Sequence, residues 1–154
     1  MKPYRYESET LLDAPLSQVF EFFSRAENLE ALTPASLKFQ ILTPLPIDIK
    51  KGTLIDYKLT LHGIPFHWQT EISIWEPESR FMDRQLKGPY KMWEHEHRFA
   101  ADGDKTRMWD TVQYLLPGGP LGAIPHALFV RREIEGIFAY RAKVLQEALQ
   151  SKLT

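Results

Sequence analysis

The 154-residue chain contains no cysteine, and this absence excludes several kinds of site at once. Without thiols the protein can form no disulfide, no zinc–thiolate centre and no catalytic thiol nucleophile. An excess of one charge is also missing, since 19 basic and 20 acidic residues leave a formal net charge of −1. No polybasic segment and no glycine-rich phosphate loop is present, so we expect neither nucleic acid nor a membrane surface as a partner.

Long hydrophobic runs are absent as well. No stretch approaches the roughly 18 apolar residues of a membrane-spanning helix. Residues 1–13 are polar and lack the apolar centre of a signal peptide, so we expect a cytoplasmic protein without an integral membrane segment. Hydrophobic residues make up 44% and charged residues 25% of the chain, as in ordinary globular proteins, and the length predicts one domain over residues 1–154.

The clearest pattern is an amphipathic helix from about Leu121 to Leu149. Its apolar residues, among them Ile134, Phe138 and Leu145, recur at steps of three and four and form one stripe. Pro125 falls in the first turn, where a missing N–H is tolerated. A helix of roughly 25 residues is about 37 Å long. A stripe of that length needs a partner surface of comparable length.

Most of the chain before this helix has the alternating pattern of β-strands. We predict strands over 4–12, 37–42, 53–61, 66–73, 80–87, 90–100 and 105–116, with short helices over 16–24 and 26–32 and a turn at 62–65. The short connections imply antiparallel pairing, and the grouping of strands away from the long helix implies an α+β domain. The sequence therefore predicts a curved antiparallel sheet of about six to seven strands wrapped around the C-terminal helix.

A Trp-x-His-x-His-x-Phe run at residues 93–99 is the strongest local feature. Its four named side chains share one face of a strand, because side chains alternate with a period of two. If Asp102-Gly103 forms a two-residue hairpin turn, His95 lies opposite Asp110. An aspartate beside an imidazole orients it and keeps it basic, so His95 and Asp110 are candidates for an acid/base pair or a polar ligand anchor. A purely structural pair and a solvent-facing one are the alternatives.

The same run raises two further possibilities. His95 and His97 have a metal-ligand spacing, and Asp110 is a conceivable third ligand, but the chain has no longer pattern of this kind, so we expect no metal and no cofactor. The preceding strand could add Asp83 or Arg84 to the cluster. Its Gly-Pro-Tyr connection does not fix the register, and a slip by one residue would exchange the two.

The order of elements and several local runs resemble the START-like, or SRPBCC, superfamily, which shares the helix-grip fold of the birch-pollen allergens. The runs that carry the resemblance are Ala14-Pro15-Leu16-Ser17-Gln18-Val19-Phe20, residues 81–90 and 93–99, Gly119-Pro120-Leu121-Gly122, and Phe129-Val130-Arg131-Arg132. Within the superfamily the chain looks similar to a bacterial branch near the polyketide cyclase/dehydrase-like proteins. The resemblance implies a cavity between sheet and helix that holds an apolar small molecule. It implies no fixed catalytic set, because the superfamily includes carriers, sensors and enzymes.

On this basis we expect a bound lipid, polyketide or isoprenoid-like molecule. The residues expected to contact it are Tyr57, Trp68, Phe81, Asp83, Trp93, His95, His97, Tyr114, Ile134, Phe138 and Arg141. A densely packed core is the alternative for the apolar members of this set. Two other functions stay open: a cyclase- or dehydratase-like enzyme that uses His95 and Asp110, and a protein-interaction domain. Residues 117–122 are a candidate lip at the cavity mouth or a rigid connector.

Overall fold

A computed structural model describes residues 2–61, 63–117 and 123–153 of the chain, so the candidate lip at 118–122 lies outside the described residues. The elements follow in the order β1 (Tyr4–Leu12), α1 (Leu16–Phe23), α2 (Asn28–Leu32), the 3₁₀ turn η1 (Ala35–Leu37), β2 (Gln40–Ile41), β3 (Leu54–Leu61), β4 (Ile64–Glu76), β5 (Arg80–Lys87), β6 (Met92–Asp102), β7 (Lys105–Leu115) and α3 (Ala123–Leu153). The predicted α+β order is confirmed.

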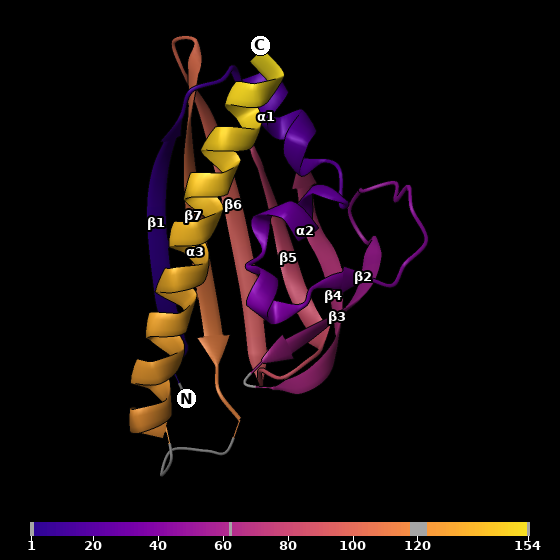
Figure 1. Ribbon diagram of the computed structural model, residues 1–154, viewed down its shortest axis with the longest axis vertical. Helices are drawn as coiled ribbons and strands as arrows, with labels where there is room; N and C mark the ends of the chain where they lie inside the picture. The colour runs from indigo at the N-terminus through magenta and orange to yellow at the C-terminus, as the bar shows by residue number, and fades with distance from the viewer. Residues whose placement is uncertain (1, 62, 118–122, 154) are drawn as a thin grey trace.

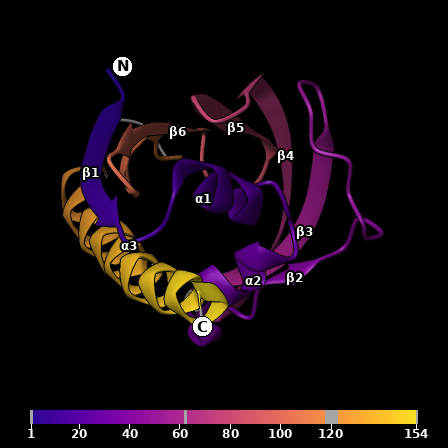
Figure 2. The same ribbon diagram turned by 90° about the horizontal axis from the view of Figure 1, so that it is seen from above.

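The strands form one antiparallel seven-stranded sheet in the order β1-β7-β6-β5-β4-β3-β2. Figures 1 and 2 show the sheet curving around α3, with α1 and α2 on the same concave side. The predicted helix stripe faces this sheet, since Ile134, Phe138, Leu145 and Leu149 are all buried. No helix in the described part of the chain is both long and apolar enough to cross a membrane.

Several predicted boundaries differ from the observed ones, and two of these errors concern how the sheet is paired. The strand expected over 37–42 shrinks to β2, because η1 precedes it and Lys38 adopts a left-handed backbone with φ of 48°. Conversely, Ile64 and Pro65 belong to β4 rather than to a turn, because Ile64 pairs directly with Leu61. Both errors come from pairing and backbone conformations that alternation alone does not show.

The predicted β6–β7 register was also wrong. Asp102 pairs with Lys105, so the two turn residues are Gly103 and Asp104 rather than Asp102 and Gly103. Gly103 has φ of 65° at the first central position, where a type II′ turn requires glycine. Moving the turn by one position shifts the pairing by two residues, so His97, and not His95, lies opposite Asp110. A two-residue shift keeps every side chain on its predicted face.

An irregularity in β4 shapes the concave face. The pairing of β4 with β5 shifts between Ile72 and Ile74, so Ser73 is an extra residue in β4. A bulge of this kind bends a strand and reverses the alternation of the side chains beyond it. Ile72 opposes Asp83 and Trp75 opposes Phe81, and all four side chains line the same cavity.

Candidate ligand cavity and buried His–Asp cluster

A cavity of about 170 Å³ lies between the inner face of strands β3 to β6, the α1–α2 segment and the middle of α3. Its aromatic wall comes from neighbouring strands and the β5–β6 connection. Tyr57 stacks on Trp68 with ring centroids 5.8 Å apart, and Trp93 packs edge-on against Trp68 at 5.5 Å. Tyr90 completes this group through an edge contact with Trp68. One side of the cavity is therefore a continuous aromatic surface.

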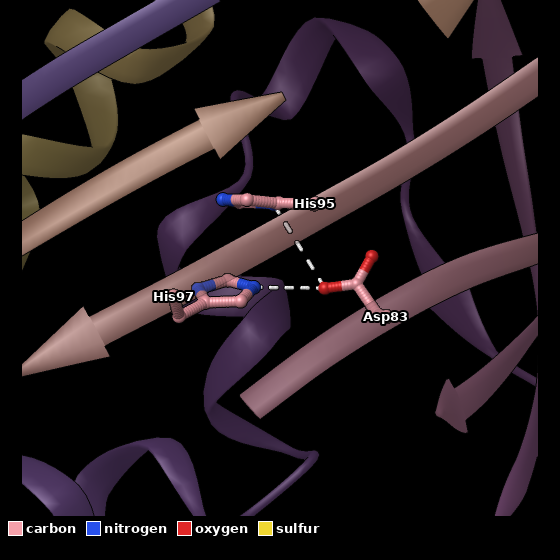
Figure 3. A group of neighbouring side chains, drawn as sticks. All are labelled: Asp83, His95 and His97. Carbon is pink, nitrogen blue, oxygen red and sulfur yellow. Dashed lines mark hydrogen bonds and ion pairs between the residues drawn. The ribbon is translucent and has the colours of Figure 1, made fainter. Parts of the chain in front are cut away.

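The cavity is also lined by a cluster of polar side chains, three of which are shown in Figure 3. His95 and His97 project from β6 towards Asp83 on β5. The register places Asp83 directly opposite His95. The Nε2 atom of His97 lies 2.8 Å from Oδ2 of Asp83, and the Nδ1 atom of His95 lies 3.8 Å from the same oxygen. The imidazole rings stack with centroids 3.7 Å apart.

A second carboxylate lies on the opposite side of the two imidazoles. Oδ1 of Asp110, on β7, is 2.7 Å from Nε2 of His95 and 3.4 Å from Nδ1 of His97. Each imidazole therefore has one nitrogen beside Asp83 and the other beside Asp110. The exposed fractions of His95, His97 and Asp110 are only 3%, 2% and 7%. The cluster is a buried quartet of two imidazoles between two carboxylates.

Burial and mutual charge set the protonation of the quartet. Burial lowers the pKa of His97 to about 4, and the neighbouring His95 adds to this effect, whereas Asp83 opposes it. Burial by itself would raise the pKa of Asp83, but the hydrogen bond with His97 and the charges of His95, His97 and Arg141 outweigh it and hold that pKa low. For Asp110 the effect of burial on the pKa is likewise outweighed, chiefly by the hydrogen bond and charge of His95. Both carboxylates are thus ionised at neutral pH, and His97 is neutral.

Arg141, on α3, carries a positive charge that helps to lower the pKa of both Asp83 and Asp110. Its guanidinium lies 5.3 Å above the ring of Phe138 and makes no ion pair with any described residue. Arg141, Phe138 and Asp110 also border a second cavity of about 20 Å³. That volume is enough for about one water molecule. Arg141 therefore contributes positive charge near both carboxylates while its own donors stay available.

The structure brings most of the predicted contact residues to one cavity. Those that line it are Tyr57, Trp68, Phe81, Asp83, Trp93, His95, His97, Ile134, Phe138 and Arg141. Tyr114 is fully buried in a neighbouring cluster with Trp93 and Tyr90, outside the lining of the larger cavity. Asp110 lies behind His95 and borders only the small cavity. Of the two candidates on β5, Asp83 and not Arg84 joins the cluster; Arg84 pairs with Glu71.

Several lining residues were not predicted from the sequence, and the reasons differ. Trp75 faces the cavity because the bulge at Ser73 reverses the alternation, which sequence does not reveal. Tyr90 precedes β6 and is held by the Gln85 side chain, which bonds to both its N–H and its carbonyl. Phe23 comes from α1, where its place in an apolar stripe indicated burial but no particular neighbour.

Comparison with known proteins identifies the fold of this chain. The sequence matches no family profile and no curated protein sequence. Many solved structures resemble the chain, including three that align over nearly its whole length. The Zhui aromatase/cyclase from Streptomyces sp. R1128 is 14% identical, with 99% of this chain and 96% of that protein covered and a TM-score of 0.77. A START superfamily protein from Mycobacterium smegmatis is 13% identical, with 97% and 99% covered and a TM-score of 0.72.

Norcoclaurine synthase from Thalictrum flavum is the third, at 13% identity, with 99% of this chain and 97% of that protein covered and a TM-score of 0.70. At such identities the likeness shows the fold alone. The chain has the helix-grip fold of the START-like superfamily, and the predicted fold class is confirmed.

Proposed function

We propose that this chain, with its helix-grip fold, binds a compact and largely apolar small molecule in the cavity between sheet and α3. The observation that carries the proposal is the cavity itself, which joins an aromatic wall to a buried polar cluster. Ligand sites combine mostly apolar walls with a few placed polar groups in this way. A merely structural core of this size would be filled to near-crystalline density.

The size of the cavity sharpens the ligand class. A dry apolar cavity of about 150 Å³ is known to accept benzene. A cavity of about 170 Å³ therefore suits a single ring, two fused rings or a short isoprenoid better than it suits a long-chain lipid. Trp68 adds a directional feature, because its buried indole N–H has no hydrogen-bond partner among the described residues. An acceptor atom on the ligand would satisfy that donor.

Arg141 indicates what the polar end of the ligand carries. A guanidinium with free donors recognises carboxylates and other planar anions through paired hydrogen bonds. Asp83 and Asp110 contribute negative charge around it, so a bound anion would sit on the Arg141 side of the cluster rather than among the carboxylates. We therefore favour a ring system bearing one acidic or hydrogen-bonding substituent.

The test is a panel of small aromatic carboxylates, phenols and short isoprenoids, measured by thermal shift and then by calorimetry. A binder present at 100 times its Kd adds about 2.7 kcal/mol to the free energy of unfolding. Ile137 lines the cavity, so Ile137→Phe should fill it and abolish binding, while Tyr140→Phe on the exposed side of α3 should leave the affinity unchanged. A panel that never moves the melting temperature, or an Ile137→Phe variant that binds normally, contradicts the proposal.

A second candidate function is cyclase- or dehydratase-like acid/base catalysis, and the 2.7 Å contact between His95 and Asp110 favours it. Asp110 lies behind His95, so it would orient the imidazole, and the other nitrogen of His95 would exchange a proton with a molecule in the cavity. Turnover of a binder found in the panel would be measured for His95→Ala and for His67→Ala. His67 pairs with Asp56 away from the cavity and provides the matched control. Equal turnover in both variants excludes His95 as the catalytic group.

A further inference from the structure

We propose that Asp83, His95 and His97 form a binding site for one divalent transition-metal ion at the polar end of the cavity. The residues offer two imidazole nitrogens and one carboxylate oxygen, a ligand set that suits Zn²⁺, Co²⁺ and Fe²⁺. Their candidate ligand atoms all lie within 4.8 Å of one another. Its three residues also line the proposed ligand cavity, but metal binding can be measured with no apolar ligand present.

Two imidazole nitrogens converge on one carboxylate oxygen. Oδ2 of Asp83 faces Nε2 of His97 at 2.8 Å and Nδ1 of His95 at 3.8 Å. Figure 3 shows the imidazoles of His95 and His97 beside the carboxylate of Asp83, and all three residues line the cavity. One nitrogen from each imidazole is therefore directed to the carboxylate that would complete the ligand set. The alternation of β6 and the pairing of β5 with β6 hold them there.

Asp110 lies where a metal site needs a supporting carboxylate. Metal-bound histidines usually donate their remaining ring N–H to a carboxylate, which fixes the tautomer and strengthens the ligand. Asp110 occupies that position for both rings, at 2.7 Å from Nε2 of His95 and 3.4 Å from Nδ1 of His97. The same carboxylate thus supports both proposed ligands from the side away from Asp83.

One buried atom of the cluster is left unsatisfied without a metal ion. The Nδ1 atom of His97 has no hydrogen-bond partner among the described residues. If neutral His97 donates its Nε2–H to Asp83, then Nδ1 carries only a lone pair, and this lone pair lies beside the Asp110 carboxylate. A metal ion on Nε2 would displace that proton and favour the tautomer protonated at Nδ1. The Nδ1–H would then face Asp110, and the orphaned atom would gain an acceptor.

Charge and access agree with this assignment. Two carboxylates, those of Asp83 and Asp110, lie against the two imidazoles, and a pair of carboxylates matches a divalent cation in a buried site. The three proposed ligands line the larger cavity, so water or a ligand group can occupy the remaining coordination positions. Bonds of about 2.0–2.2 Å place the ligand atoms of a tetrahedral ion roughly 3.3–3.6 Å apart. The 2.8 Å contact between His97 and Asp83 would therefore open, and the 3.8 Å contact between His95 and Asp83 would close slightly. The imidazoles, now stacked with an angle of 28° between them, would tilt towards the ion.

The test begins with Co²⁺, whose visible absorption reports nitrogen and oxygen coordination. Metal-stripped protein should bind one Co²⁺ per chain, and Zn²⁺ should displace it. Asp83→Asn should abolish this binding, and Asp110→Asn should weaken it by about 10- to 100-fold, as loss of a supporting carboxylate does. Asp56→Asn removes the carboxylate of the exposed His67–Asp56 pair and should change nothing. Circular dichroism and urea denaturation in the presence of chelator establish that each variant is folded.

A measurement on the unmutated protein avoids any folding defect. In ¹⁵N-detected imidazole spectra, Zn²⁺ should shift Nδ1 of His95 and Nε2 of His97, and it should leave His67 unchanged. Absence of saturable binding, binding that survives Asp83→Asn in folded protein, or shifts confined to His67 would each overturn the site. None of these results bears on the apolar ligand, which is titrated with chelator present.

Discussion

The two ends of the concave sheet face are built differently, although the same strands run through both. Beneath α1, the space between sheet and helix is filled by a cluster that includes Phe20, Phe99 and Leu149. Further along α3, towards its middle, the same space is left partly open and lined by aromatic rings and the His–Asp quartet. β6 crosses the boundary, with Phe99 in the filled end and Trp93 in the hollow one.

This difference shows what leaves the cavity open. α1 lies across one end of the curved sheet, and its buried face supplies Val19, Phe20, Phe22 and Phe23 to the core there. The shorter α2 buries only Leu32. Two of the buried α1 side chains, Phe22 and Phe23, also border the cavity, so the solid packing ends at the C-terminal end of α1. We therefore expect the filled end to contribute more to the stability of the fold than the hollow end does.

The largest expected effect lies in the filled end. Phe20 contacts Trp75, Phe81 and Phe99 at ring-centroid distances of 5.1, 6.3 and 5.4 Å. Phe20→Ala should lower the free energy of unfolding by roughly 3–5 kcal/mol, because it removes a buried ring and leaves a void. Urea denaturation measures this change. A loss below about 1 kcal/mol would mean that the two ends do not differ in packing.

The next largest effect is the pH dependence of stability that arises from His97, which lies between the two ends. This dependence is measured with chelator present. Because the pKa of His97 is about 4 in the folded state and its ordinary value is 6.5, the unfolded chain binds more protons between these pH values. The free energy of unfolding should therefore be highest above pH 6.5 and should fall as the pH drops towards 4. At 1.36 kcal/mol per pKa unit, the expected loss is roughly 3 kcal/mol. Protonation of Asp83 and Asp110, whose pKa values are lowered, continues the loss at lower pH.

Denaturation at a series of pH values checks this dependence. His97→Gln should flatten the slope between pH 6.5 and 4, while His67→Gln should keep it, because His67 is half exposed and outside the cluster. An unchanged slope in folded His97→Gln would assign the proton uptake to another group.

The smallest expected effect on stability lies in the hollow end. Ile137 is only partly buried and already borders open space, so Ile137→Ala should cost less than about 1 kcal/mol. The same change enlarges the cavity, and it should shift preference in the ligand panel towards larger ring systems. A cost comparable with that of Phe20→Ala would show that the middle of α3 is as tightly packed as the end near α1.

Much of the candidate site was predictable residue by residue. Alternation correctly put His95 and His97 on one face of β6, and the helix stripe correctly placed Ile134 and Phe138 towards the sheet. It was harder to predict which carboxylate lies beside which imidazole. Asp110 was expected opposite His95 but pairs with His97, and it still bonds to His95 through a diagonal contact. The roles of these residues in binding and catalysis stay predictions.

The sequence by itself determined the features that covalent geometry imposes: the periods of strand and helix, and hence the face on which each side chain lies. Only the tertiary structure decided the turn at Gly103, the bulge at Ser73 and the choice of Asp83 over Arg84. These depend on how neighbouring strands are aligned, and a one-residue change costs little locally but reassigns partners across the sheet. The cavity is likewise a property of the assembled elements, because an empty volume exists only between surfaces that meet incompletely.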